Sequence, residues 1–198
     1  MTYHYYMFHK PFGCVTARRD ARFPVVMDYF RHLRNERLSP VGRLDRETEG
    51  LLMITDDGRW NQSISHPACH VPKTYEFMAM GILDADKLKC LSKGILLTGA
   101  DRPTAGAELA VTGQTILSRV RPGLHPDMQE KLKHNLPNHP VVCGQITIRE
   151  GKKRQIRRML KAVGCCVIYL KRLSIGSIVL APALQPGEFK EYFPFHTN

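Results

Sequence analysis

A charged segment at 42–50, bounded by glycines at both ends, runs directly into an apolar run at 51–54. Asp45 stands between Arg43 and Arg46 inside this segment. A short apolar run that follows turn residues is typical of a buried strand. The segment is therefore interpreted as a loop that ends on the core and presents one carboxylate to a ligand, with arginines that attract phosphate groups. A helix cap or a turn is the alternative for an Arg-Leu-Asp tripeptide taken alone.

The charge balance indicates a polyanionic partner. The 198 residues include 29 Lys and Arg against 18 Asp and Glu, which gives a formal net charge of +11. Such an excess favours nucleic acid, because neutralising phosphates releases counterions. A membrane surface is the alternative, but no long basic amphipathic helix is evident. The chain lacks an apolar run of membrane-spanning length and an N-terminal secretion signal, so a cytoplasmic location is expected.

The order of expected elements mixes helices and strands without regular alternation. Strands are expected at 3–9, 51–55, 73–80, 94–97, 108–111, 115–120, 141–149, 167–170 and 178–180. Helices are expected after Pro24, at 59–65, after Asp84, at 125–135 and at 153–163. This order predicts an α+β domain with a largely antiparallel sheet.

Several motifs together resemble one enzyme family. The 41–52 segment is similar to the catalytic signature of ribosomal pseudouridine synthases, of type A for the small subunit and types B, E and F for the large one. The remaining matching segments are 10–13 (Lys-Pro-Phe-Gly), 71–76, 150–159, 170–176 and 182–189. The resemblance covers nearly the whole chain, from Lys10 to Phe189.

The resemblance implies a particular fold and domain organisation. It implies a pseudouridine synthase fold of the α+β class, with a largely antiparallel mixed central sheet flanked by helices and two lobes around a basic cleft. The expected organisation is a single catalytic domain over 1–198, without the N-terminal S4 domain that most family members carry. We also expect a monomer.

The resemblance also implies an activity and three catalytic residues. The family isomerises uridine to pseudouridine in folded RNA by base flipping, without a cofactor. Asp45 matches the essential aspartate. Two roles stay open for its carboxylate, namely attack at C1′ of the ribose and removal of the proton from C2′. Tyr75 matches a tyrosine that stacks on the flipped uracil, although a core strand tyrosine is the alternative. Arg157 matches an arginine that pairs with the aspartate, and Arg158 would replace it if the register slipped by one.

Ribosomal RNA is the expected partner, and a set of basic residues is expected to bind it. Arg43 matches an arginine that enters the RNA near the vacated position; the alternative is that it only pairs with an acid. The expected RNA-binding residues are Lys10, Arg43, Arg46, Lys73, Lys153, Arg154, Arg158, Lys171 and Arg172. No metal is expected, because His66, Cys69 and His70 lack a nearby fourth ligand.

The motifs leave the substrate partly open. The 56–60 segment and the closing segment resemble the branch for the small subunit, whereas 154–159 resembles the branches for the large subunit. A synthase acting on transfer RNA is one alternative. A non-catalytic RNA-binding or ribosome-assembly factor with the same fold is another, and it would not need Asp45.

Overall fold

The computed structural model describes residues 2–194 and divides the chain into two compact units. Unit 1 contains residues 1–71 and 171–198, and unit 2 contains residues 72–170. Strand β7 (Cys166–Ile175) crosses the boundary, so its first half belongs to unit 2 and its second half to unit 1. Among residues 2–194, no helix has both the length and the apolar character needed to cross a membrane.

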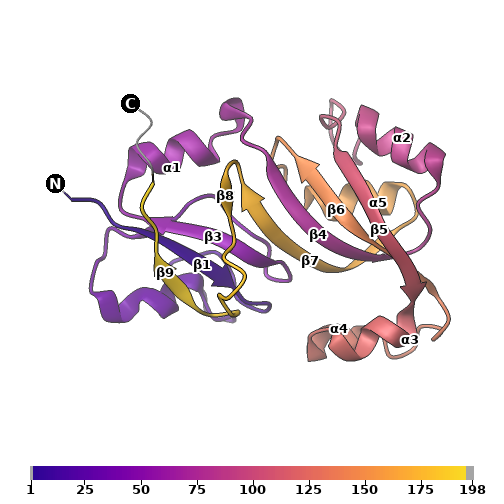
Figure 1. Ribbon diagram of the computed structural model, residues 1–198, viewed down its shortest axis with the longest axis horizontal. Coiled ribbons are helices and arrows are strands. Elements are labelled where there is room, and N and C mark those ends of the chain that lie inside the picture. The colour runs from indigo at the N-terminus through magenta and orange to yellow at the C-terminus, as the bar shows by residue number, and fades with distance from the viewer. Residues whose placement is uncertain (1, 195–198) are drawn as a thin grey trace. The chain divides into compact units, whose positions relative to one another are not determined.

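Unit 1 is built on strand β1 (Tyr5–Lys10), which pairs antiparallel with β3 (Glu49–Thr55) and β9 (Phe189–Glu191) (Figure 1). Strand β2 (Ser39–Pro40) pairs with β3, and β8 (Ile178–Val179) pairs with β7. The second half of β7 runs parallel to the start of β3. Helices η1 (Val26–Leu33), α1 (Gly58–Ser65) and η2 (Pro67–Cys69) complete the unit.

Alternate residues of β1 contribute to two separate groups of apolar side chains in unit 1. Met7 packs with Leu51 and Met53 of β3, and Trp60 of α1 lies against this cluster. Phe8 contacts the rings of Tyr29 and Phe30 from η1. Because both faces of β1 and β3 are covered, nearly every residue of these strands is buried.

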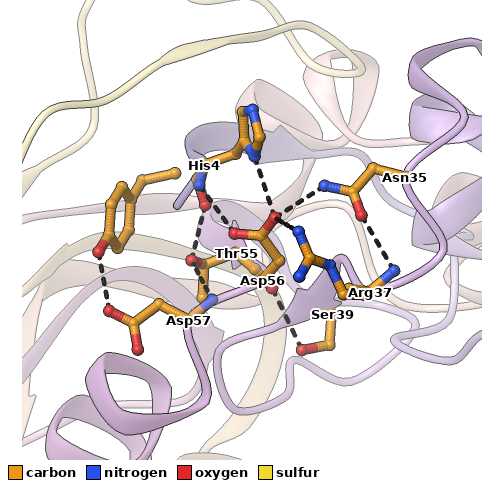
Figure 2. Close-up of polar contacts among 8 residues, drawn as sticks. His4, Asn35, Arg37, Ser39, Thr55, Asp56 and Asp57 are labelled. Atoms are coloured by element: carbon orange, nitrogen blue, oxygen red, sulfur yellow. Dashed lines mark hydrogen bonds and ion pairs between the residues drawn. The ribbon is translucent and has the colours of Figure 1, made fainter. Parts of the chain in front are cut away.

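A polar network fixes the end of β3 in unit 1 (Figure 2). The buried carboxylate of Asp56 accepts hydrogen bonds from His4 and from the side chain of Asn35, and Arg37 lies 3.6 Å from it. These contacts hold its pKa at about 2, although burial works in the opposite direction. The neighbouring Asp57 caps α1 by accepting from the amides of Arg59 and Trp60.

Unit 2 contains a sheet in the order β5-β6-β4-β7 (Figure 1). Strand β6 (Pro140–Ile148) pairs antiparallel with β4 (Lys73–Met80) on one side and with β5 (Glu108–Ile116) on the other. The helices are α2 (Ala85–Lys93), α3 (Leu117–Val120), η3 (Arg121–Gly123), α4 (Pro126–Lys131) and α5 (Gln155–Ala162). Each unit thus combines antiparallel strands with helices, which confirms the α+β prediction.

Two predicted strands are wrong. Residues 94–97 do not form a strand, because the amide and carbonyl of Ile95 bond to Thr104 instead of to a neighbouring strand. Residues 115–120 do not form a separate second strand, because β5 continues past a bulge between Val111 and Gly113 as far as Ile116, and α3 begins at Leu117. The predicted helix at 153–163 begins later, at Gln155, because Arg154 has a left-handed φ of 52°.

Candidate active-site segments

The loop that presents Asp45 connects β2 to β3 in unit 1 and is fixed by backbone contacts. The side chain of Leu44 is buried, and Thr16 both donates to its carbonyl (2.9 Å) and accepts from its amide (3.1 Å). The amide of Thr48 donates to the Asp45 carbonyl at 3.0 Å, which closes a turn. The backbone of the loop is therefore held on both sides of Asp45.

Lys10 supports this loop from inside the protein. Its side chain is fully buried, and its ammonium donates to the carbonyls of Thr48 (2.8 Å) and Pro11 (2.9 Å), with a longer contact to Arg46 (3.4 Å). Burial lowers the pKa of Lys10 to about 8. A fully buried ammonium cannot contact RNA, so the prediction that Lys10 binds RNA is wrong in this structure. Lys10 instead holds the backbone of the Asp45 loop.

Arg172 is likewise buried, and its Nε donates to the Leu51 carbonyl at 2.7 Å. Gly50 lies against its backbone with a φ of 101°, and a Cβ at Gly50 would be 2.3 Å from the Arg172 carbonyl oxygen. Only glycine permits this close parallel pairing. The prediction that Arg172 contacts RNA is therefore also corrected, because its guanidinium anchors β3.

The carboxylate of Asp45 is half-buried, and within the described part of unit 1 it makes no hydrogen bond or ion pair. Arg43 is exposed, and no acid of unit 1 among the described residues pairs with it. The alternative that Arg43 only pairs with an acid therefore finds no partner in this unit. Arg46 lies over the ring of Phe23 at 4.5 Å and 3.8 Å from Glu47. Within the described part of unit 1, the loop thus offers an acid without a hydrogen-bond or ion-pair partner, whose charge acts through space on the buried Lys10, and one arginine without an acidic partner.

His9 is a buried residue near this loop and is not among the residues predicted for the site. It is 3% exposed, and its Nδ1 lies 2.7 Å from the Leu184 carbonyl. Burial lowers the pKa of His9, so the neutral ring is favoured at neutral pH. Thr16, which holds Leu44, gave no sequence signal, because its partner is 28 residues away.

Unit 2 contains the predicted tyrosine. Tyr75 lies in β4 opposite Ile146 of β6, and its side chain is 7% exposed. The predicted alternation along this strand is confirmed, since Phe77 and Ala79 are also buried while Glu76 is half-exposed. Lys73, at the start of β4, is half-buried.

Helix α5 places two of the predicted arginines on different neighbours. The Nη1 of Arg157 donates to the Val167 carbonyl of β7 at 3.1 Å, whereas Arg158 donates to the Thr98 carbonyl at 2.6 Å. The two arginines therefore do not occupy interchangeable positions. Lys153 and Arg154 are exposed and precede the helix, so they do not share its face.

The buried Gln155 organises the start of α5. It accepts from the Lys152 amide at 2.9 Å and donates to Glu150 at 2.6 Å, and Glu150 in turn accepts from the Ala105 amide. Gln155 is not among the residues predicted for the site. Its hydrogen bonds tie the basic segment 152–154 to the loop before β5.

The predicted site residues divide between the two units. Asp45, Arg43, Arg46 and Lys171 belong to unit 1, and Tyr75, Lys73, Lys153, Arg154, Arg157 and Arg158 belong to unit 2. The meeting of Asp45 with Tyr75 and Arg157 stays a prediction. Over residues 2–194, no three His, Cys, Asp or Glu side chains form a group that could hold a metal ion, and His66 caps η2 instead.

Comparison with known proteins gives a consistent result along the sequence. A sequence profile described as RNA pseudouridylate synthase matches residues 4–162. Uncharacterized RNA pseudouridine synthase YtzG of Bacillus subtilis is 35% identical over 189 residues, which are 94% of this chain and 69% of the relative. Ribosomal small subunit pseudouridine synthase A of Haemophilus influenzae is 32% identical over 94% of this chain and 68% of its own length. Ribosomal large subunit pseudouridine synthase B of Bacillus subtilis is 32% identical over 96% of this chain and 68% of its own length.

The solved structures agree with the sequence comparison. A crystal structure described as a pseudouridylate synthase matches with a TM-score of 0.78 at 30% identity, over 97% of this chain and 71% of that chain. An H/ACA ribonucleoprotein structure with a substrate RNA matches with a TM-score of 0.57 at 16% identity, over 92% of this chain and 50% of that chain. At that identity the second match shows the fold alone.

Proposed function

Because the chain belongs to the RNA pseudouridylate synthase family, we propose that it isomerises a uridine of ribosomal RNA to pseudouridine without a cofactor. Relatives named for the small and the large ribosomal subunit support this class of RNA as substrate. The net charge of +11 suits a polyanionic partner. We place this reaction in the cytoplasm and assign it to a monomer.

The observation that carries this proposal is the state of Asp45. Its carboxylate is half-buried on a loop with a fixed backbone and has no hydrogen-bond or ion-pair partner in the described part of unit 1. A fixed acid without an internal partner is suited to act on a ligand. The reaction breaks the N1–C1′ bond, turns the uracil and forms a C5–C1′ bond, with a proton lost from C5 and one gained at N1. Asp45 would act on the ribose, as a nucleophile at C1′ or as a base at C2′.

The target base must leave its stack before Asp45 can reach the sugar. Arg43 is exposed and has no acidic partner in the described part of unit 1, which suits a side chain that enters the RNA at the vacated position. Tyr75 would stack on the extruded uracil through its aromatic face. Arg157 would orient Asp45 through its guanidinium once RNA is bound.

Six further cations would bind the RNA backbone. They lie in the Asp45 loop, at the start of β4, around α5 and in β7, and are Arg46, Lys73, Lys153, Arg154, Arg158 and Lys171. The exposure of Lys153 and Arg154 supports direct phosphate contact. Arg46, which already lies over Phe23, and Arg158, which bonds to Thr98, would contribute mainly charge.

Asp45→Asn tests the proposal. This change keeps the size of the side chain but removes the acid, so we expect pseudouridine formation to fall at least 10³-fold, a loss of about 4 kcal/mol of transition-state stabilisation. RNA affinity should stay within a few-fold of the parent. Pseudouridines are mapped on both ribosomal RNAs by carbodiimide-dependent primer stops, with and without the gene.

The matched control is Asp101→Asn, because Asp101 is exposed and far from Asp45 in sequence. This variant should retain parental activity. Normal turnover in Asp45→Asn would reject the mechanism. A parent that binds ribosomal RNA but forms no pseudouridine would indicate a non-catalytic factor, and stops confined to transfer RNA would move the substrate to that class.

A further inference from the structure

Unit 1 contains a pocket of about 950 Å³ to which none of the residues assigned above contributes. Its apolar lining residues are Phe30 and Leu38, which are buried, and the half-buried Met27. Four guanidinium groups line it: Arg18, Arg19, Arg31 and Arg34. We call this site the arginine pocket.

The walls of the arginine pocket are held by hydrogen bonds. Arg18 donates from Nη1 to the Glu36 carbonyl (2.8 Å) and from Nη2 to the Leu38 carbonyl (2.9 Å). Asn35 donates to the buried Asp56, which fixes the same wall to the end of β3 (Figure 2). Because this wall is already fixed, binding a ligand does not incur the entropic cost of ordering it.

The charge of the arginine pocket is largely uncompensated. Arg31 pairs with Asp28 at 2.6 Å. Among residues 2–194, the guanidinium groups of Arg19 and Arg34 have neither a hydrogen bond nor an ion pair. Glu36 is the single carboxylate among the lining residues. With Arg31 paired to Asp28, three arginines remain against the one lining carboxylate, and this excess of positive charge beside the apolar Met27 favours a ligand with phosphate and a flat ring.

The segment that carries Arg18 and Arg19 is joined to the Asp45 loop at both ends. Before these arginines, Thr16 holds the backbone of Leu44. After them, the ring of Phe23 lies under Arg46. An RNA strand with its target uridine at Asp45 would therefore pass close to the pocket.

We propose that the arginine pocket binds an unpaired, phosphate-bearing nucleotide of the RNA substrate, near the target uridine. This inference rests on the proposed function and deepens it, because it assigns a second recognition point outside the catalytic segments. Arg19 and Arg34 contact the phosphates, and the base lies against the half-buried Met27.

The test compares Arg19→Gln/Arg34→Gln with Lys89→Gln/Lys93→Gln. Both double variants remove two exposed cations, but the control lysines lie on α2, away from the pocket residues in sequence and in the other unit. The probe is a fluorescein-labelled uridine 12-mer, titrated by anisotropy at several salt concentrations. For single strands, each lost phosphate contact reduces the salt slope by about 0.7 and the affinity by about fivefold at 0.1 M salt.

We expect the pocket variant to bind the 12-mer about 25-fold more weakly at 0.1 M salt, with a slope smaller by about 1.4. The KM for ribosomal RNA transcripts should rise by a similar factor. The lysine control should change affinity less than threefold, and both variants should melt within about 2 °C of the parent, because the removed groups make no internal contact. Equal losses of RNA affinity in the two variants would contradict the proposed pocket, because they would reflect only the lower net charge.

Two more measurements separate the remaining outcomes. A 4-thiouridine 12-mer should cross-link to a peptide within residues 27–38; cross-links confined to other peptides would overturn the assignment. Uridine 5′-monophosphate should bind at least 100-fold more weakly than the 12-mer, and equal affinity would make a free nucleotide the occupant. In one outcome the parent forms no pseudouridine, while the pocket variant still loses more RNA affinity than the lysine control. That result would reject the proposed function but support the arginine pocket as an RNA-binding site.

Discussion

Among single residues, Lys10 and Arg172 have in common that their cationic groups donate to backbone carbonyls inside unit 1. Sequence motifs placed both on an RNA-facing surface, because a cation is usually exposed. Their burial could not be predicted, since the acceptors Thr48 and Leu51 are 38 and 121 residues away. Asp45 and Arg43 could be assigned to a loop, because both lie between glycines and next to an apolar run.

Lys10→Met should destabilise the protein. The change removes the donor to the carbonyls of Pro11 and Thr48, and unsatisfied buried carbonyls cost roughly 2 kcal/mol in total. We expect this loss in the free energy of unfolding, measured with urea at pH 7. Lys93→Met, at an exposed position of α2, is the control and should stay within about 0.5 kcal/mol of the parent.

The same pair of proteins tests the pKa of Lys10. The folded-state pKa is about 8 and lies below the ordinary 10.5, so the unfolded chain binds more protons between these values. The stability of the parent relative to Lys10→Met should therefore grow as the pH rises from about 8 to 10.5. A stability difference that shrinks over this range would contradict the assignment.

At the scale of elements, local sequence patterns predicted those strands and helices that rely on their own residues. Strand β4 was predicted with its observed bounds, because its buried and half-exposed residues alternate. Helix α2 begins after Asp84, which accepts from the Lys87 amide as an N-cap. The segment 94–97 was misassigned because its backbone partner, Thr104, lies in a loop with no periodic pattern.

The parallel pairing of β3 with β7 depends on the absence of a side chain at one position. Gly50→Ala would place a Cβ 2.3 Å from the Arg172 carbonyl oxygen at a φ of 101°. We expect a loss of about 3 kcal/mol from overpacking and backbone strain. Chemical denaturation measures this loss of stability. The backbone amides of the Asp45 loop should also exchange hydrogen with solvent faster than in the parent.

Gly151→Ala is the matched control for Gly50→Ala, because nothing lies within 4 Å of a Cβ at Gly151. It should change stability by less than about 0.5 kcal/mol. If Gly50→Ala proved equally mild, β3 and β7 would not be as closely paired as the structure describes.

At the scale of the whole chain, the Asp56 network joins three segments that are distant in sequence (Figure 2). It connects His4 near the N-terminus, Asn35 before β2 and the end of β3. The order of expected helices and strands predicted the fold class, and the charge balance predicted a polyanionic partner. They did not predict this network, because Asp56 and Asp57 resemble an ordinary turn in the sequence.

Asp56→Asn should make the protein less stable and less sensitive to acid. The pKa of Asp56 is lowered from 3.8 to about 2, so its carboxylate contributes stability above pH 3.8 that is lost as the pH falls through 2. We expect a loss of roughly 2 kcal/mol at pH 7 from the buried hydrogen bonds. Thermal unfolding between pH 2 and 7 checks both effects; Asp101→Asn should follow the parent curve.

The division of β7 between the two units has a consequence for biosynthesis. Unit 1 needs its N-terminal strands and a second piece that is translated about a hundred residues later, after all of unit 2. A nascent chain that has not yet reached Arg172 cannot close the strand beside Gly50, and β1 has no β9 on its other edge. The N-terminal half of unit 1 therefore stays incomplete until β7 has been translated, and messages truncated before β7 should yield a product that proteases or chaperones remove.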